Sequence, residues 1–334
     1  MLNNIIKTFL TVLLLASCES PTSQIQEREI KPGLPVINIG RLICGGHLPL
    51  AVVEKKYQEQ LTGFQLNTIQ NHDWNNVISD MTSGKLAGTF ILSPLAMNLI
   101  HEGFAGKIVL MANRNGNAFV LSNSIRSIND LKRQNTVIAV PHVFSQHNVL
   151  LHKVLQQHNI SKEKVTVLGM PPRDMINALR SGDIDGFVVG EPEGAKSVNL
   201  NVGWLAAISS TIWKNHMDHV FLASDHFINE QPEKLQELIN QLVRGGEFIE
   251  GNPRLASIMG EAYTGSKADI FEKVLTSPPD RISYTNMVAN KADMNMMAEQ
   301  LVEMKLWPAV PHNLVGGYFN MHFVEQAEQL VRGE

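Results

Sequence analysis

The feature that most constrains this chain is the alternation of short, β-rich apolar runs with segments of helical periodicity. Each apolar run is followed by a helical segment and then by another run. The first three apolar runs are 36–43, 64–69 and 87–92, and the helical segments that follow them are 48–60, 74–83 and 94–102. This order is typical of βαβ units, in which a helix carries the chain back across the sheet to the next parallel strand. The predicted fold class is therefore α/β, with mainly parallel sheets flanked by helices.

A second α/β round follows the first, and the end of the chain is mostly helical. Strands are predicted at 108–111, 118–121, 137–140, 165–168, 187–189 and near 205–209, and helices at 127–132, 145–158 and 173–181. Further helices are predicted at 231–249, 253–264, 268–275, 284–304 and 321–332. One economical arrangement inserts a second lobe (123–222) into a first (36–122 and 223–334), with a ligand cleft between them.

The first residues indicate export from the cytoplasm. Lys7 precedes an apolar run, 9–16, that is too short to span a bilayer and fits the core of a signal peptide. Leu15-Ala16-Ser17-Cys18 follows and resembles the lipobox of bacterial lipoproteins, whose cysteine is acylated. We therefore expect a signal peptide at 1–17, a fatty-acylated Cys18, and a polar linker over 18–35. The alternative is an ordinary secretory signal that happens to precede a cysteine.

Charge and cysteine content exclude several classes of protein. Lys and Arg number 28 against 32 Asp and Glu, a net charge of −4, so no basic footprint for nucleic acid is visible. Removal of 1–17 takes away Lys7 alone and leaves −5, which does not suggest a polybasic membrane surface. With Cys18 lipidated, only Cys44 remains, so the mature chain contains no intramolecular disulfide.

Candidate ligand-binding residues come directly after the predicted strands, because ligands of open α/β sheets bind at the carboxyl ends of strands. They are Gly45-Gly46-His47, Trp74 after Asp73, Ser93, the pair His142 and His147, and Gly190-Glu191-Pro192-Glu193. Each has an ordinary alternative: a glycine turn with positive φ, core packing of the indole, a helix N-cap at Asp73 or Ser93, and surface histidines.

Signatures of catalysis and of metal binding are lacking in the sequence. It contains no GxSxG elbow and no GxxxxGK[ST] phosphate loop, and Cys44 lies in an apolar run with no base near it. Among the 12 histidines there is no HExxH motif and no Cys-His cluster, and the spacing of His142 and His147 does not put them on one helix face. The sequence therefore predicts no enzyme, no cofactor and no metal site.

Several stretches resemble the nitrate, sulfonate and taurine group of ABC-transporter substrate-binding proteins, nearest the nitrate- and bicarbonate-binding branch. They are the opening at 40–57, the Ser83-Gly84-Lys85-Leu86-Ala87-Gly88 turn, and Met170-Pro171-Pro172 through Gly190-Glu191-Pro192, within a similarity from about 36 to 330. The resemblance implies a two-lobed periplasmic-binding-protein fold of type II. It also implies a lipid-anchored, monomeric receptor on the periplasmic side of the membrane that passes a small solute to an ABC permease. Pocket residues of that branch fall on Trp74, Asn117 and His147.

Two departures from that branch leave the solute open. Glu193 stands where its relatives carry tryptophan, and Met217-Asp218-His219 stands where they carry a basic residue. An unpaired carboxylate in a cleft disfavours an inorganic anion. A nitrate-, bicarbonate-, sulfonate- or taurine-like solute and a small neutral or zwitterionic molecule all remain candidates. The alternative functions are a pyrimidine-precursor protein of the thiamin-biosynthesis type, whose cysteine cluster this chain lacks, and a ligand-sensing lipoprotein without transport.

Overall fold

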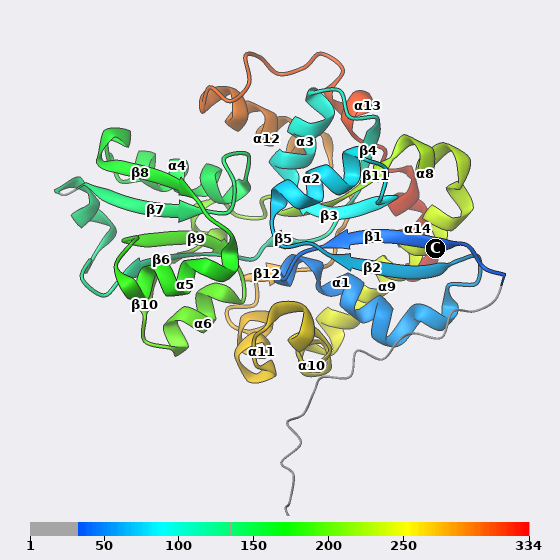
Figure 1. The fold of residues 1–334 in the computed structure, drawn as a ribbon, viewed down its shortest axis with the longest axis horizontal. Coiled ribbons are helices and arrows are strands. Elements are labelled where there is room, and N and C mark those ends of the chain that lie inside the picture. Colours follow the sequence, from blue (N-terminus) through cyan, green and yellow to red (C-terminus); the bar gives the residue numbers. More distant parts are fainter. Residues whose placement is uncertain (1–32, 134, 334) are drawn as a thin grey trace, which may run out of the picture. The chain divides into compact units, whose positions relative to one another are not determined.

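Two five-stranded sheets and a two-stranded sheet, surrounded by helices, make up the part of the chain that the computed structural model describes, residues 33–133 and 135–333 (Figure 1). The chain from Leu34 onward forms one compact unit. The predicted signal peptide, Cys18 and nearly all of the linker lie outside the described residues. Within the described residues, no helix is both long and apolar enough to cross a membrane.

The first sheet, with its helices, is called lobe 1. Its strands are β1 (Val36–Arg41), β2 (Gln65–Gln70), β3 (Gly88–Leu92), β4 (Gly106–Met111) and β11 (His219–Ser224), in the order β2-β1-β3-β11-β4. Its helices are α1 (Leu48–Val52) with the turns η1 (Gly45–His47), η2 (Val53–Tyr57) and η3 (Gln58–Gln60), α2 (Trp74–Thr82), α3 (Ser93–His101), α8 (Asp225–Glu230), α9 (Pro232–Gly251), α10 (Pro253–Thr264), α11 (Ala268–Thr276), α12 (Lys291–Glu303), α13 (Leu314–Tyr318) and α14 (His322–Arg332).

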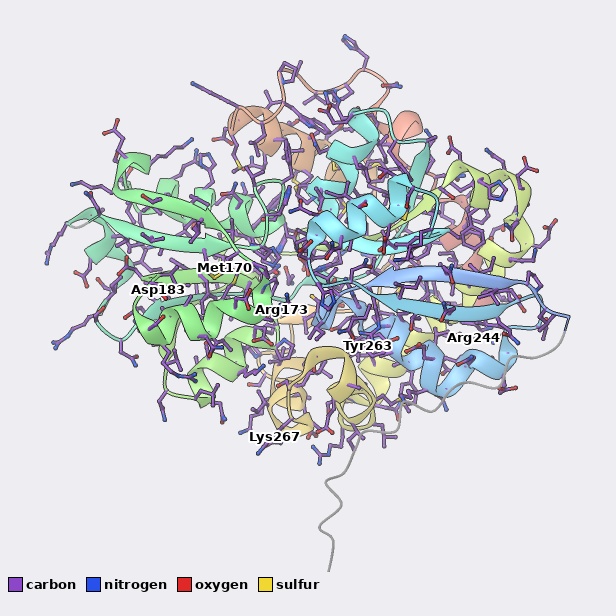
Figure 2. All side chains as sticks on the ribbon, viewed as in Figure 1. Met170, Arg173, Asp183, Arg244, Tyr263 and Lys267 are labelled. Atoms are coloured by element: carbon purple, nitrogen blue, oxygen red, sulfur yellow. The ribbon has the colours of Figure 1, made fainter. Side chains whose placement is uncertain are left out.

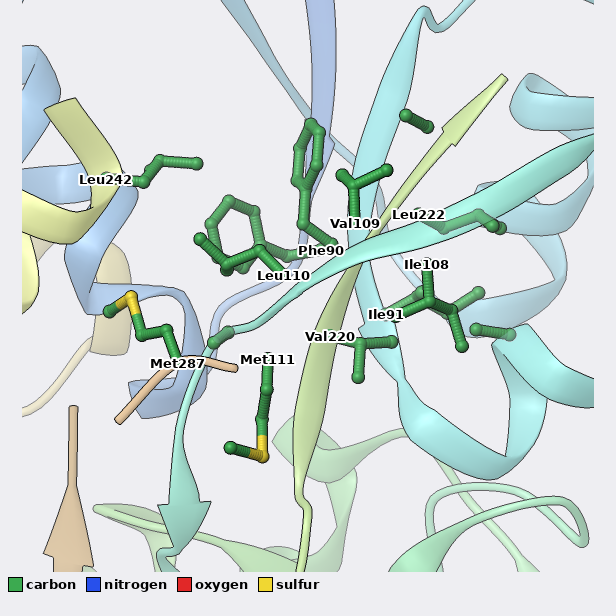
Figure 3. Close-up of a cluster of buried hydrophobic side chains, with 14 of the residues drawn as sticks. Phe90, Ile91, Ile108, Val109, Leu110, Met111, Val220, Leu222, Leu242 and Met287 are labelled. Carbon is green, nitrogen blue, oxygen red and sulfur yellow. The ribbon is translucent and has the colours of Figure 1, made fainter. Parts of the chain in front are cut away.

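The central strands of lobe 1 are apolar on both faces, as strands covered by helices on each side must be. Side chains of β3, β4 and β11 such as Phe90, Ile91, Val109 and Val220 are fully buried and join Leu242 of α9 in one core (Figure 3). This rigid core holds the ends of β1, β3 and β11 in place.

Lobe 2 is built on the second sheet, in the order β10-β6-β9-β7-β8. Its elements are β6 (Asn117–Ser122), η4 (Ile128–Lys132), β7 (Thr136–Val140), α4 (Gln146–Gln157), η5 (Lys162–Lys164), β8 (Val165–Gly169), α5 (Pro172–Ser181), β9 (Gly186–Gly190), α6 (Glu193–Asn199), β10 (Gly203–Ile208) and α7 (Ser209–Ile212). Side chains alternate along β9, so Val188 joins a core with α4, whereas Phe187 and Val189 join another with α5.

Both sheets are mainly parallel, as predicted, and each contains one antiparallel strand. In lobe 1, β1 runs parallel to β2 and β3, but β11 lies antiparallel between β3 and β4. In lobe 2, β7 runs parallel to β8 and β9, but β6 is antiparallel to β9 and β10. In each sheet the antiparallel strand is the first one after a crossing between the lobes, β6 in lobe 2 and β11 in lobe 1, and it runs against the direction of the other strands. Hydrophobic pattern does not encode that direction.

The strands at the crossings belong to the opposite lobes from those predicted. β6 was assigned to lobe 1 through its end at 122, yet it pairs with β9 and β10, and β11 begins at His219, before the predicted return at 223. The chain leaves lobe 1 near β5 (Arg114–Asn115), which pairs with β12 (Ile282–Ser283), and returns at Met217, which forms a bridge with Arg114. Only the hydrogen-bond partners of a strand decide its lobe.

Most predicted elements are present, and the exceptions concern helix starts. Asp73 caps α2, as predicted, by accepting a hydrogen bond from the Asn76 N–H (2.8 Å). The helix predicted over 284–304 begins only at Lys291, after a cap at Asn290, because Tyr284 is buried in the core instead. Ser93 is the first residue of α3 and makes no capping bond, contrary to the N-cap alternative.

Candidate functional site

A small cavity of about 10 Å³ lies where the strand ends of the two lobes meet. Lobe 1 contributes Cys44, Trp74 and His219 to its wall, and lobe 2 contributes His147, Gly190 and Glu193. Arg173, at the start of α5, marks the same boundary, since its Nη1 donates to Nδ1 of His72 in lobe 1 at 3.2 Å (Figure 2). The structure thus brings residues from three of the predicted loops, those at Trp74, at His147 and at Gly190 to Glu193, to one place.

Three rings pack together on the lobe 1 side of the site, and two of them, Trp74 and His219, line the cavity. The ring centroids of His47 and His219 lie 5.0 Å apart at 87°, and Trp74 lies 5.9 Å from His219 and 6.3 Å from His47. All three side chains are at most 3% exposed. Trp74 therefore belongs both to the core of lobe 1 and to the cavity wall, so its two alternative roles coexist.

His219 is held between a thiol and a carboxylate. Its Nε2 lies 3.6 Å from Cys44 Sγ, and its Nδ1 donates to Asp218 Oδ2 at 3.0 Å. Burial by itself lowers the pKa of His219, but the Cys44 sulfur and the Asp218 carboxylate more than offset burial and raise the pKa to about 10. The base that the sequence lacks near Cys44 is thus supplied by β11.

Asp218 is the centre of a buried polar network behind the cavity. Its carboxylate accepts hydrogen bonds from Asn113 Nδ2 (2.7 Å), Asn117 Nδ2 (3.1 Å) and Gln146 Nε2, besides His219. Burial acts to raise the pKa of Asp218, yet His219 and the other neighbours hold it well below its usual range. Asn117, a predicted ligand contact, is placed in this network, with its Nδ2 also 3.1 Å from Nε2 of His216.

His147 reaches the cavity from the first turn of α4. It is 1% exposed, and neither ring nitrogen has a hydrogen-bond partner among the described residues. Burial lowers the pKa of His147 to about 3, with Asp218 opposing and His219 and His216 adding to the shift. The ring is therefore neutral. His142, its predicted partner, instead accepts from the Phe144 N–H with Nδ1 (3.0 Å).

The two glycines before His47 permit close approach rather than a turn, since neither has a positive φ. The Gly45 N–H donates to Glu191 O of lobe 2 at 3.0 Å, and a Cβ at Gly45 would lie 2.3 Å from that oxygen. A Cβ at Gly46 would lie 2.4 Å from Nδ1 of His219. One glycine lets the lobes meet, and the other lets His219 pack.

Glu191 joins the lobes and does not line the cavity. Its Oε1 accepts from Arg281 Nε (2.9 Å) and pairs with Nη2, while Oε2 accepts from the Ala195 N–H (3.0 Å). Tyr284 follows Arg281 after the two residues of β12, and its hydroxyl donates to Gly45 O at 2.8 Å. The Gly-Glu-Pro break after β9 is thus part of the contact between lobes.

Two further predicted site residues have defined partners. Glu193 is 7% exposed and forms an ion pair with Lys196 Nζ at 3.2 Å, and burial raises the pKa of Glu193. Ser93 is fully buried, and its hydroxyl donates to Met217 O at 3.3 Å. Glu193 thus lines the cavity with its charge balanced, whereas Ser93 anchors the segment that carries Asp218 and His219.

Four residues of this region were not among the predicted site residues: Cys44, Asp218, Arg281 and Tyr284. Cys44 and His219 are 175 positions apart, and Glu191 and Arg281 are 90 apart. No local spacing rule connects such pairs. Signals did exist for two of them, because Cys44 directly precedes the predicted Gly45-Gly46-His47 loop and Asp218 directly precedes His219.

The fold is that of the periplasmic substrate-binding proteins. The nitrate-binding protein NrtA from Synechocystis PCC 6803 superimposes with a TM-score of 0.84 at 15% identity, covering 90% of each chain. The zinc-bound ligand-binding component of an ABC-type import system from Staphylococcus aureus gives 0.80 at 18% identity, covering 88% of this chain and 99% of that one. The fold class expected from the sequence is confirmed.

The family follows from the sequence comparison. Residues 31–262 match the model of the NMT1-like family, so the chain belongs to that family. The nitrate import ATP-binding protein NrtC of Synechocystis sp. is 28% identical over 252 residues, which are 68% of this chain and 37% of that protein. The chain therefore spans little over a third of that relative. The predicted resemblance to the nitrate and sulfonate group is confirmed.

Proposed function

We propose that this chain is the solute-binding component of an ABC importer and that it captures a small solute by closure of its two lobes. The observation that carries the proposal is that the site is assembled from both lobes, with Cys44, Trp74 and His219 facing His147 and Gly190. A ligand that touches both lobes binds the closed form better than the open form, and so shifts the equilibrium towards closure. No bond in the solute needs to change, so no catalysis is part of this function.

Contacts between the lobes stabilise the closed form. The Gly45 N–H bonds to Glu191 O, and the Glu191 carboxylate pairs with Arg281, which is 11% exposed at its side chain. Both interactions flank the cavity. Closure and solute capture are thereby coupled through neighbouring residues.

The names of the relatives support a role in solute transport. NrtC is named as a nitrate import protein and NrtA as a nitrate-binding protein, so nitrate and related small solutes are the first to test. The pairing of Glu193 with Lys196 removes one objection to an anion, whereas the buried Asp218 carboxylate beside His219 remains. The cavity in this arrangement holds about one water-sized occupant, so a larger solute requires the lobes to lie further apart than they do here.

The predicted signal peptide and lipobox support a location for the proposed receptor, and the relatives support a partner. The proposal includes acylation at Cys18, a position on the periplasmic side of the membrane, action as a monomer, and delivery to an inner-membrane permease. A ligand-sensing lipoprotein would close on the same solute without a permease. Capture of a permease after cross-linking in membranes separates these two functions.

The test is direct binding by the full chain. Native mass spectrometry of freshly purified protein would identify a co-purified solute. Calorimetry and small-angle scattering would then examine nitrate, bicarbonate, taurine, alkanesulfonates and pyrimidines. We expect heat and compaction with one class of solute, changed by Glu193→Gln but not by the control Glu163→Gln, whose side chain is exposed on lobe 2. Absence of a co-purified solute, of heat and of compaction across the panel would contradict the proposal.

A further inference from the structure

A set of donor atoms suited to a metal ion lies at and beside the cavity wall. The donor atoms of Cys44, His47 and His219 all lie within 4.8 Å of one another. A zinc ion with bonds of about 2.3 Å to sulfur and about 2.0 Å to nitrogen, at the tetrahedral angle, holds the two donors roughly 3.6 Å apart. The distance from Cys44 Sγ to His219 Nε2 is 3.6 Å.

Both histidines are oriented as metal ligands are. Metal-binding imidazoles usually donate their second N–H to a carboxylate or a backbone carbonyl, which turns the other nitrogen toward the ion. His219 Nδ1 bonds to the Asp218 carboxylate at 3.0 Å. His47 Nδ1 lies 3.1 Å from Leu42 O and 3.0 Å from Leu42 N, so in the tautomer that donates to the carbonyl its Nε2 is the free ligand atom. His47 Nε2 is buried and has no hydrogen-bond partner in the described ranges.

A fourth donor comes from the other lobe. The Cβ position of Gly190 lies 3.2 Å from Cys44 Sγ and 3.7 Å from His147 Nε2, so both atoms converge on the same small space. Both nitrogens of His147 are buried without a partner in the described structure. A cavity of about 10 Å³ holds about one water-sized occupant.

A hydrogen bond between the Cys44 thiol and His219 explains the closeness of these two side chains but not the unpartnered nitrogens around them. It leaves His47 Nε2 and both nitrogens of His147 without partners, and buried polar atoms in native proteins are almost always satisfied. A cation coordinated by all four side chains gives a partner to His47 Nε2 and to one nitrogen of His147. The carboxylate of Asp218 behind His219 also favours a cation over an anion.

We propose that Cys44, His47 and His219 bind a late first-row transition-metal ion, zinc or copper, and that His147 completes the site when the lobes close. One thiolate with imidazoles is a donor set that selects these metals over magnesium or calcium. The inference rests on the proposed function for its biological meaning, since it names a metal ion as the class of solute. The site itself does not depend on transport.

The test is metal binding by the full chain after treatment with a chelator. Calorimetry with Zn²⁺, competition for Cu⁺ against a chromogenic chelator, and Co²⁺ absorption form its three arms. We expect one equivalent of metal and a thiolate-to-cobalt charge-transfer band. Cys44→Ser should abolish the band, and His47→Gln should weaken binding by on the order of 100-fold or more. His312→Gln, on an exposed histidine, is the control.

The outcomes separate this inference from the proposed function. Metal-dependent compaction in the wild type, reduced in His147→Gln, supports the fourth ligand. If Zn²⁺, copper and Co²⁺ all fail to bind, or if Cys44→Ser and His47→Gln bind like the wild type, the metal site is refuted. Should Cys44→Ser not fold, His47→Gln and His147→Gln decide by themselves. A co-purified solute of another class, with no metal, refutes this inference and leaves solute capture standing.

Discussion

Substitution of Gly45 by alanine should hold the two lobes apart without harming either. The added Cβ would lie 2.3 Å from Glu191 O, against an ordinary minimum of 3.0 Å, so the carbonyl must move away by roughly 1 Å. This clash costs about 1–3 kcal/mol, and loss of the 3.0 Å hydrogen bond from the Gly45 N–H costs about 1 kcal/mol more. Open and closed forms of a two-state protein differ by a few kcal/mol. The closed-to-open ratio should therefore fall by roughly 30- to 700-fold.

Lobe 1 itself tolerates the alanine. Gly45 has no positive φ, and its other close neighbour, Phe271 Cζ at 3.3 Å, needs to shift by only a few tenths of an ångström. The unfolding midpoint should therefore stay near that of the wild type. Gly251→Ala is the matched control, because a Cβ there meets nothing within 4 Å.

Small-angle scattering of the full chain measures the effect. With the bound solute present, we expect a radius of gyration for the wild type that matches the closed structure, a larger one for Gly45→Ala, and a wild-type value for Gly251→Ala. Superimposable scattering curves for the wild type and Gly45→Ala would refute the reasoning. In that case the contact between Gly45 and Glu191 would not limit closure.

The remaining predictions concern stability and the anchor. Asp218→Asn should lower the free energy of unfolding by about 3–5 kcal/mol, because it removes a buried charge that accepts four hydrogen bonds. The control Asp280→Asn, at an exposed residue, should lower it by under about 1 kcal/mol. A loss that small for Asp218→Asn in a denaturant titration would contradict this prediction. The folded state keeps His147 neutral down to a pKa of about 3, whereas a histidine in the unfolded chain is protonated below about pH 6.5. The contribution of His147 to the free energy of unfolding is therefore complete above about pH 6.5. It shrinks as the pH falls, by up to about 1.4 kcal/mol per pH unit. His147→Gln in chelator should therefore flatten the slope of stability between pH 6.5 and 4, and equal slopes would count against a neutral His147. Cys18→Ser should abolish incorporation of a palmitate analogue and release the protein from membranes; a variant that stays membrane-bound would argue against the anchor.

Much of the candidate site could be located from the sequence by one rule. Because parallel strands place their carboxyl ends at one edge of a sheet, His47, Trp74, His147 and Gly190 were expected together, and all lie at or beside the cavity. The rule does not give the orientation of a side chain. Ser93 obeys it as well, yet its hydroxyl bonds to Met217 O behind the site.

The functional pairing of Cys44 with His219 could not be predicted. Cys44 ends an apolar run near the start of the chain, and His219 begins a strand that returns from lobe 2. Whether that strand lies beside β3 is decided by backbone hydrogen bonds between distant segments, which leave no local pattern. The same reason accounts for the antiparallel strand in each sheet and for the assignment of β6 to lobe 2.

The sequence by itself determined the local structure: the order of strands and helices, their approximate limits, caps such as Asp73 and Ser145, and the α/β class. These follow from apolar periodicity and capping chemistry, which act over a few residues. The tertiary structure alone decided the strand order, the close approach at Gly45 and Gly46, and the convergence of a thiol and two imidazoles. Those depend on which distant surfaces pack together, and packing is a property of the whole folded chain.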